Sequence, residues 1–104
     1  MMEYRTKRGN TWPPIRAILL HRGAPINLTG ATVTLHAQAG ARTFSQPVTI
    51  LDAERGSVEC LLDDVDVAIA GGFRAEFVVV FADGRKVTVP NRGHFGIIID
   101  DSIA

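Results

Sequence analysis

The sequence predicts an all-β protein built as an antiparallel two-layer β-sandwich of seven or eight strands. Apolar residues recur with a period of two far more often than with the 3.6-residue period of a helix. Turn-forming residues interrupt this alternation about every 8 to 14 positions, which is typical of many short strands. Two layers would cover the apolar faces that an open sheet leaves in water, and 104 residues suffice for one such core. We therefore expect one domain, residues 1–104.

Seven strands follow from the alternation, at residues 12–19, 32–38, 44–50, 58–62, 73–82, 86–90 and 95–99. The first contains Pro13 and Pro14 near its start, because a residue without an N–H is tolerated on a sheet edge or in a bulge. The second alternates apolar and polar residues, as a half-buried strand does. Pro47 interrupts the third. Between the first two strands, residues 21–25 are expected to turn the chain.

One short helical turn is expected near residues 64–70. Asp63 can cap its N-terminus, carboxylates follow in the first turn, and Gly71 and Gly72 end the segment. A helix of this length is not stable alone, so we expect it to form a corner between two strands.

The strand at 73–82 has the most regular pattern in the chain. Phe73, Ala75 and Phe77 alternate with more polar neighbours and are expected to face the core. The Asp-Gly pair that follows this strand tolerates positive φ, so it predicts a tight hairpin to the strand at 86–90.

The charge balance and the hydropathy pattern exclude several kinds of partner. Eleven Lys and Arg residues balance eleven Asp and Glu residues. This balance lacks the basic excess of nucleic-acid and anionic-membrane binders, so we expect neither partner. No stretch approaches the roughly 20 apolar residues of a membrane span, and the N-terminus lacks a secretory signal pattern. The protein is therefore expected to be made in a cytoplasm.

The chain carries none of the common catalytic motifs. A phosphate-binding loop, a nucleophile elbow and a zinc-protease motif are all missing from the sequence. Its single cysteine, Cys60, excludes an intramolecular disulfide and alternates with Val58 and Leu62. We expect Cys60 to point inward as a small apolar residue rather than to act as a nucleophile. The protein is therefore expected to be neither an enzyme nor a cofactor carrier.

The residues that could bind a metal ion do not group as ligands do. The histidines are spread over the chain, at His21, His36 and His94. The three aspartates between residues 63 and 66 lack the glycine and glutamate that complete a calcium loop, so helix capping explains them better. We expect no metal site.

The residues best suited to a protein interface are bulky, stiff or carried by loops near predicted sheet edges. They are Tyr4, Trp12, Pro13, Pro14, Arg16, Pro90, Asn91, Arg92 and His94. Trp12 suits two places, a plug in the core or an exposed anchor, since Trp is enriched at interface hot spots. Residues 1–8 contain the one basic cluster and are expected to form an arm that is either flexible or bound to a partner.

Five short segments, in this order and at compatible spacing, carry a family resemblance. They are Arg8-Gly-Asn-Thr-Trp-Pro-Pro14, Leu28-Thr-Gly-Ala-Thr-Val33, Gly72-Phe-Arg-Ala-Glu-Phe77, Ala82-Asp-Gly84 and Val89-Pro-Asn91 with Gly93. Together they resemble the N-terminal domain of the baseplate upper proteins of tailed phages. In that family the domain is a β-sandwich of immunoglobulin-like character that fixes a baseplate component to the tail core.

The resemblance implies a non-enzymatic structural protein of a phage or prophage tail or baseplate. It implies protein–protein contacts with other tail or baseplate proteins and a place in the virion, after synthesis in the bacterial host cytoplasm. We expect a homo-oligomer as well. The alternative that the residues leave open is a carbohydrate-binding sandwich that uses Trp12, although a sugar platform normally presents several aromatic side chains.

Overall fold

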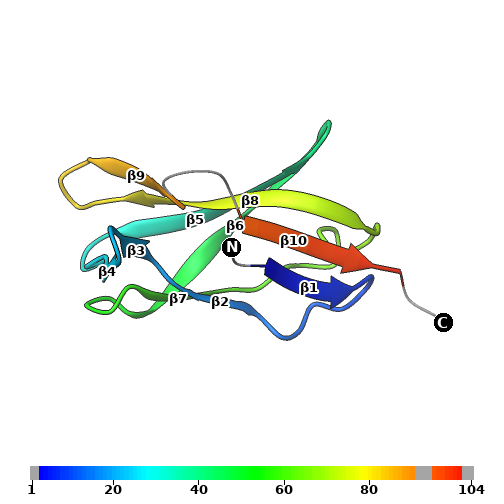
Figure 1. The fold of residues 1–104 in the computed structure, drawn as a ribbon, viewed down its shortest axis with the longest axis horizontal. Coiled ribbons are helices and arrows are strands. Elements are labelled where there is room, and N and C mark those ends of the chain that lie inside the picture. Colours follow the sequence, from blue (N-terminus) through cyan, green and yellow to red (C-terminus); the bar gives the residue numbers. More distant parts are fainter. Residues whose placement is uncertain (1–2, 91–94, 102–104) are drawn as a thin grey trace.

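The computed structural model describes residues 3–90 and 95–101 and confirms the predicted all-β class (Figure 1). Ten strands are formed by the described residues. They are β1 (Glu3–Lys7), β2 (Ile15–Ile18), β3 (Leu20–His21), β4 (Ala24–Pro25), β5 (Thr32–Ala39), β6 (Arg42–Asp52), β7 (Ser57–Cys60), β8 (Gly71–Val80), β9 (Lys86–Val89) and β10 (Phe95–Asp100).

Strand β6 joins the two layers of the sandwich. Eight strands pair with one another: seven follow the order β1-β10-β8-β5-β6-β7-β2, and β9 lies beside the second half of β8. β6 pairs with β5 as far as Val48 and with β7 from Thr49 onward, so it runs from the first layer into the second (Figure 1). The first layer therefore contains β1, β10, β8, β9, β5 and the start of β6. The second contains the end of β6, β7 and β2.

Pro47 lies within β6, just before the strand changes layers. At this position β6 is paired with β5 through Thr34, and its pairing with β7 has not yet begun. The N–H that Pro47 lacks is therefore not needed for pairing with β7. Pro47 was expected to interrupt the strand, and the observed pairing instead continues through it.

One pairing departs from the expected antiparallel arrangement. β1 runs parallel to β10, from Glu3 beside Gly96 to Lys7 beside Asp100. The Arg5 guanidinium strengthens this pairing with two hydrogen bonds to the Asp100 carboxylate, of 2.9 and 3.1 Å. Residues 1–8 were expected to form an arm, and the described part of this segment is a paired strand of the first layer.

The short helical turn expected near residues 64–70 is not formed. Residues 64–67 make hydrogen-bonded turns, with the Asp66 N–H donating to the Asp63 carbonyl at 3.1 Å. A second bond, from the Ala68 N–H to the Val65 carbonyl, is 3.4 Å long. Aspartate side chains bond the backbone of this segment, which gives its N–H groups partners outside a helix. The prediction was wrong in the conformation and right in placing a corner there.

The interior is a single cluster of buried apolar side chains drawn from both layers. Phe73, Ala75 and Phe77 on β8 are all buried, which confirms the inward phase expected for this strand. The Phe77 ring stacks on Phe95 of β10 with a centroid separation of 5.2 Å. Cys60 is buried as well, as its alternation predicted.

Gly56 lies where the backbone of the second layer meets the segment around the small β3–β4 hairpin. It adopts a φ of +67° and accepts a 2.8 Å hydrogen bond from the Leu19 N–H. A Cβ atom at this position would stand 2.7 Å from the Leu19 carbonyl oxygen and 3.0 Å from that of Ile26. Both its φ and its surroundings therefore require glycine.

We expect Gly56→Ala to destabilise the fold by more than about 2 kcal/mol, since backbone strain adds to a clash with main-chain atoms that cannot rotate away. Gly40→Ala is the matched control, because Gly40 also has a positive φ (+60°) but open space around it. Its cost should stay near the roughly 1 kcal/mol of backbone strain alone. Urea unfolding of both variants measures the difference, and equal losses would contradict the close approach.

Candidate interaction surface

Two loops meet at one end of the sandwich and are held there by hydrogen bonds. The loop from β1 to β2 contacts the loop from β7 to β8 through the Gly9 N–H, which donates to the Val67 carbonyl at 2.9 Å. The Tyr4 hydroxyl of β1 donates to the Pro13 carbonyl at 2.6 Å. The Arg8 N–H donates to the Asp100 carbonyl at 2.7 Å. Three different elements therefore fix the β1–β2 loop.

Trp12 stands on this fixed loop with 75% of its surface exposed. Of the two places that its sequence context allowed, the structure excludes the core plug. A bulky apolar side chain held outward by an ordered loop is the arrangement found in interface anchors, because little conformational entropy is lost on binding.

Three further apolar side chains project from the neighbouring β7–β8 loop. They are Leu61, Val65 and Ile69, of which Val65 is the most exposed at 79%. With Trp12 they make four of the eight large apolar side chains that the structure exposes among its described residues. We call Trp12, Leu61, Val65 and Ile69 the apolar end. The sequence analysis missed the last three, although their regular spacing of four residues was visible, with Val65 and Ile69 inside the expected helical turn.

A polar network beneath the apolar end holds the β7–β8 loop in place. The Gln46 amide of β6 donates to one oxygen of Asp63 at 2.9 Å and to one oxygen of Asp66 at 2.7 Å. The two aspartates also cap each other, since each carboxylate accepts from the backbone N–H of the other, at 3.0 and 3.2 Å. Asp66 is 4% exposed and has all of its buried polar atoms paired.

The two carboxyl groups of this network titrate differently because their surroundings differ. The hydrogen bond from Gln46 lowers the pKa of Asp63, and the N–H of Asp66 acts in the same direction. Burial raises the pKa of Asp66, against the hydrogen bonds that favour its charged form. Burial also raises the pKa of the Cys60 thiol to about 11, with the charge of Asp66 as a second cause.

The remaining interface candidates lie in different places. Arg16 is exposed on β2 and forms an ion pair with Glu59 of β7, with 3.0 Å between Nε and Oε1. Pro14 is half-buried beside the apolar end. Pro90 directly follows β9 of the first layer, so it belongs to another surface. The candidates Asn91, Arg92 and His94 lie outside the described residues.

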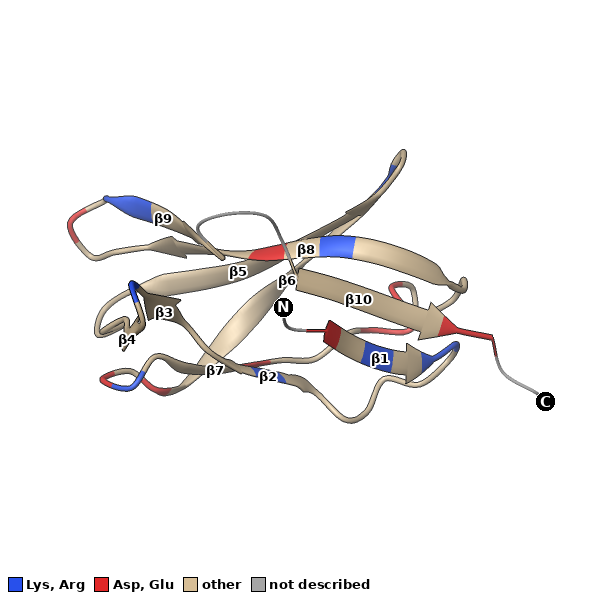
Figure 2. Ribbon diagram, in the orientation of Figure 1, with Lys and Arg blue, Asp and Glu red and all other residues tan. Residues whose placement is uncertain are grey.

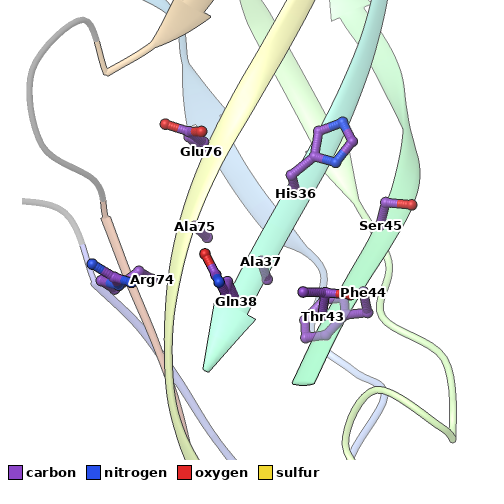
Figure 3. Close-up of a pocket in the computed structure, with 9 residues that line it drawn as sticks. All are labelled: His36, Ala37, Gln38, Thr43, Phe44, Ser45, Arg74, Ala75 and Glu76. Atoms are coloured by element: carbon purple, nitrogen blue, oxygen red, sulfur yellow. The ribbon is translucent and has the colours of Figure 1, made fainter. Parts of the chain in front are cut away.

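The first layer carries a polar groove of about 530 Å³ on the outer face of β6, β5 and β8 (Figure 3). Its polar side chains form two cross-strand rows, Ser45-His36-Glu76 and Thr43-Gln38-Arg74. The first row holds the residue types of a hydrolytic triad, but no hydrogen bond joins these three side chains, and the Glu76 carboxylate points away from His36 (Figure 3). The groove offers hydrogen-bonding groups without an activated nucleophile.

Charges of both signs are distributed over the ribbon without a region of one sign (Figure 2). Within residues 3–90 and 95–101, no three His, Cys, Asp or Glu side chains are grouped closely enough to hold a metal ion. Across the same ranges, no helix has the length and apolar character needed to cross a membrane.

Comparisons with known proteins identify a family and a related fold. Residues 13–104 match the family model described as the BppU N-terminal domain. Among solved structures, the chain is similar to the "N-terminal domain of phage TP901-1 ORF48", with a TM-score of 0.68 and 19% sequence identity. The similarity covers 96% of this chain and 99% of that one, and at this identity it concerns the fold alone. No curated protein sequence is significantly similar to the chain.

We expect Asp66→Ala to destabilise the fold by about 1–3 kcal/mol, because it leaves the Asp63 N–H without its side-chain acceptor and removes one of the two acceptors of the Gln46 amide. Asp66→Asn is the control. Its amide oxygen can still accept the hydrogen bonds from the Asp63 N–H and the Gln46 amide, and the substitution removes a buried charge. Denaturant unfolding should show a clearly smaller loss for the asparagine variant. A loss as large as that of alanine would contradict the assigned role.

The raised pKa of Cys60 predicts a thiol that stays protonated near pH 8 and does not react in the folded protein. Because the thiolate is the reacting form, iodoacetamide should alkylate Cys60 in the folded protein on the order of 100-fold more slowly than in the urea-unfolded chain. Mass spectrometry of timed samples gives both rates. Similar rates in the two states would show that the thiol is accessible and ionised.

Proposed function

The chain belongs to the family of the BppU (baseplate upper protein) N-terminal domain, and from this premise we propose that it joins a phage tail or baseplate through protein–protein contacts made by the apolar end. Family membership gives it a structural role in the phage tail. The finer assignment, that this particular surface makes the contact, is supported by the exposure of Trp12, Leu61, Val65 and Ile69.

The apolar end has the physical properties of a docking surface. Its four exposed side chains lie on two adjoining loops, and burying them against a partner removes apolar surface from water. The loops are already fixed by the Tyr4 and Gly9 hydrogen bonds and by the Gln46 network, so binding would order few groups. The proposed partner is another tail or baseplate protein with a complementary apolar surface.

The proposal describes a structural protein without catalytic activity or cofactor, made in the bacterial host cytoplasm and carried in the virion tail. It involves no nucleic acid and no membrane. Of the seven aromatic side chains, Trp12 alone is exposed, and the other six are partly or fully buried. Its exposed neighbours at the apolar end are aliphatic, which favours a protein partner over a stacked sugar.

Particles produced by the phage or prophage that encodes this chain test the proposal. We expect mass spectrometry of purified tails to detect the chain, and deletion of its gene to yield particles without a complete baseplate under the electron microscope. Complementation with Trp12→Ala should reduce the amount of chain per tail at least about tenfold, as truncation of an interface anchor does.

Val80→Ala is the matched control, because Val80 is an exposed apolar residue on β8, away from the apolar end. It should complement as well as the natural sequence. Purified tails that lack the chain, with normal baseplates after gene deletion, would refute the structural role. Normal incorporation of the Trp12 variant would refute the assignment of the apolar end alone.

A further inference from the structure

The outer face of the second layer exposes more apolar surface than that of the first. Ile18 of β2 and Leu51 near the end of β6 are both exposed, Ile18 to 59%. On the first-layer strands that the structure describes, Val80 is the one large apolar side chain exposed to this degree. Since the first layer is wider, the apolar residues are concentrated on the smaller face.

An ion pair lies on this face, in the row beside that of Ile18. Arg16 of β2 and Glu59 of β7 are direct cross-strand neighbours, with side chains 70% and 23% exposed. In the next outward-facing row, Ile18 of β2 stands opposite Ser57 of β7. We call Arg16, Ile18, Leu51, Ser57 and Glu59 the β2–β7 face. One row pairs a positive side chain, Arg16, with a negative one, Glu59. The other pairs a large side chain, Ile18, with a small one, Ser57.

We propose that the β2–β7 face binds the same face of a second copy of this chain. A two-fold axis that runs parallel to the strands, between β2 and β7, exchanges the positions of the two strands. It places Arg16 of one copy over Glu59 of the other, and Ile18 over the small Ser57 of the other copy. The face is therefore complementary to itself in charge and in side-chain size, as a two-fold interface requires.

The size of the face determines how tightly the copies associate. With the axis between β2 and β7, these two strands are the ones that face their counterparts on the other copy. Strands lie about 4.8 Å apart, so the contact is narrower than an interface of about 800 Å² per partner needs. The dimer is therefore weak in dilute protein and forms where copies are held at high local concentration. Its meaning as an assembly contact rests on the proposed function, in which copies of the chain would meet within a tail or baseplate.

Sedimentation velocity from about 10 µM to about 1 mM, the range in which small interfaces associate, measures the dimer directly. We expect concentration-dependent dimerisation of the natural chain. Ile18→Asp should weaken it at least about tenfold by placing a charge in the contact. Arg5→Glu is the control, because Arg5 also forms an exposed ion pair but on the first layer, and it should leave dimerisation unchanged.

Charge reversal separates contacts between copies from contacts within one copy. In a dimer of Arg16→Glu alone or of Glu59→Arg alone, positions 16 and 59 of opposite copies carry like charges at both symmetry-related contacts. Each single variant should therefore fail to self-associate. An equimolar mixture of the two variants should form a heterodimer, since each charge then meets its opposite on the other copy. A role of the ion pair within one chain alone predicts no association in the mixture.

A chain that stays monomeric over this range, or a dimer that Ile18→Asp and both charge reversals leave intact, would overturn the proposal. A dimer broken by the single reversals but not restored in the mixture would overturn the two-fold pairing of Arg16 with Glu59. These outcomes are independent of the proposed function, which fails only if the chain is missing from purified tails. Circular dichroism of every variant verifies that each remains folded.

Discussion

The surfaces of this protein depend on the division of β6 between two layers. A single strand pairs with β5 through its first seven residues and with β7 through its last few, so the two layers cannot move apart without breaking its ladders. The crossing also fixes where β7 ends and the β7–β8 loop begins. Gln46, close to the crossing, bonds both aspartates of that loop. The strand that closes the core therefore also orders the apolar end.

The two layers present chemically different outer faces. The first layer is broad and carries a groove lined by hydrogen-bonding side chains in two cross-strand rows. The second is narrow and exposes apolar residues together with the Arg16–Glu59 ion pair. Folding alone does not require this division, because both faces lie outside the core. In a protein that assembles with others, a polar larger face stays solvated and a smaller face with exposed apolar residues is available for contact.

Period-two alternation located the main strands because each has one buried face, and Phe73 to Phe77 shows this most clearly. It missed β1, whose residues carry one buried side chain, Thr6, and whose order comes from a partner more than 90 residues away. In the β7–β8 loop, a capping aspartate and two terminating glycines suggested a short helical turn, but the aspartate side chains bond the backbone of the loop instead. Whether Trp12 is buried depends on tertiary contacts, which a lone aromatic in a loop does not encode.

The parallel pairing of β1 with β10 has a mechanical consequence. Because the strands run in the same direction, Glu3 starts one end of the ladder and Asp100 finishes the other. A force that pulls these two residues apart acts along both strands in opposite senses, and it shears all hydrogen bonds of the ladder at once. A hairpin pulled at its two ends would instead unzip one bond at a time. Tension transmitted through the first and last strands therefore meets the stiffest resistance that their hydrogen bonds can offer.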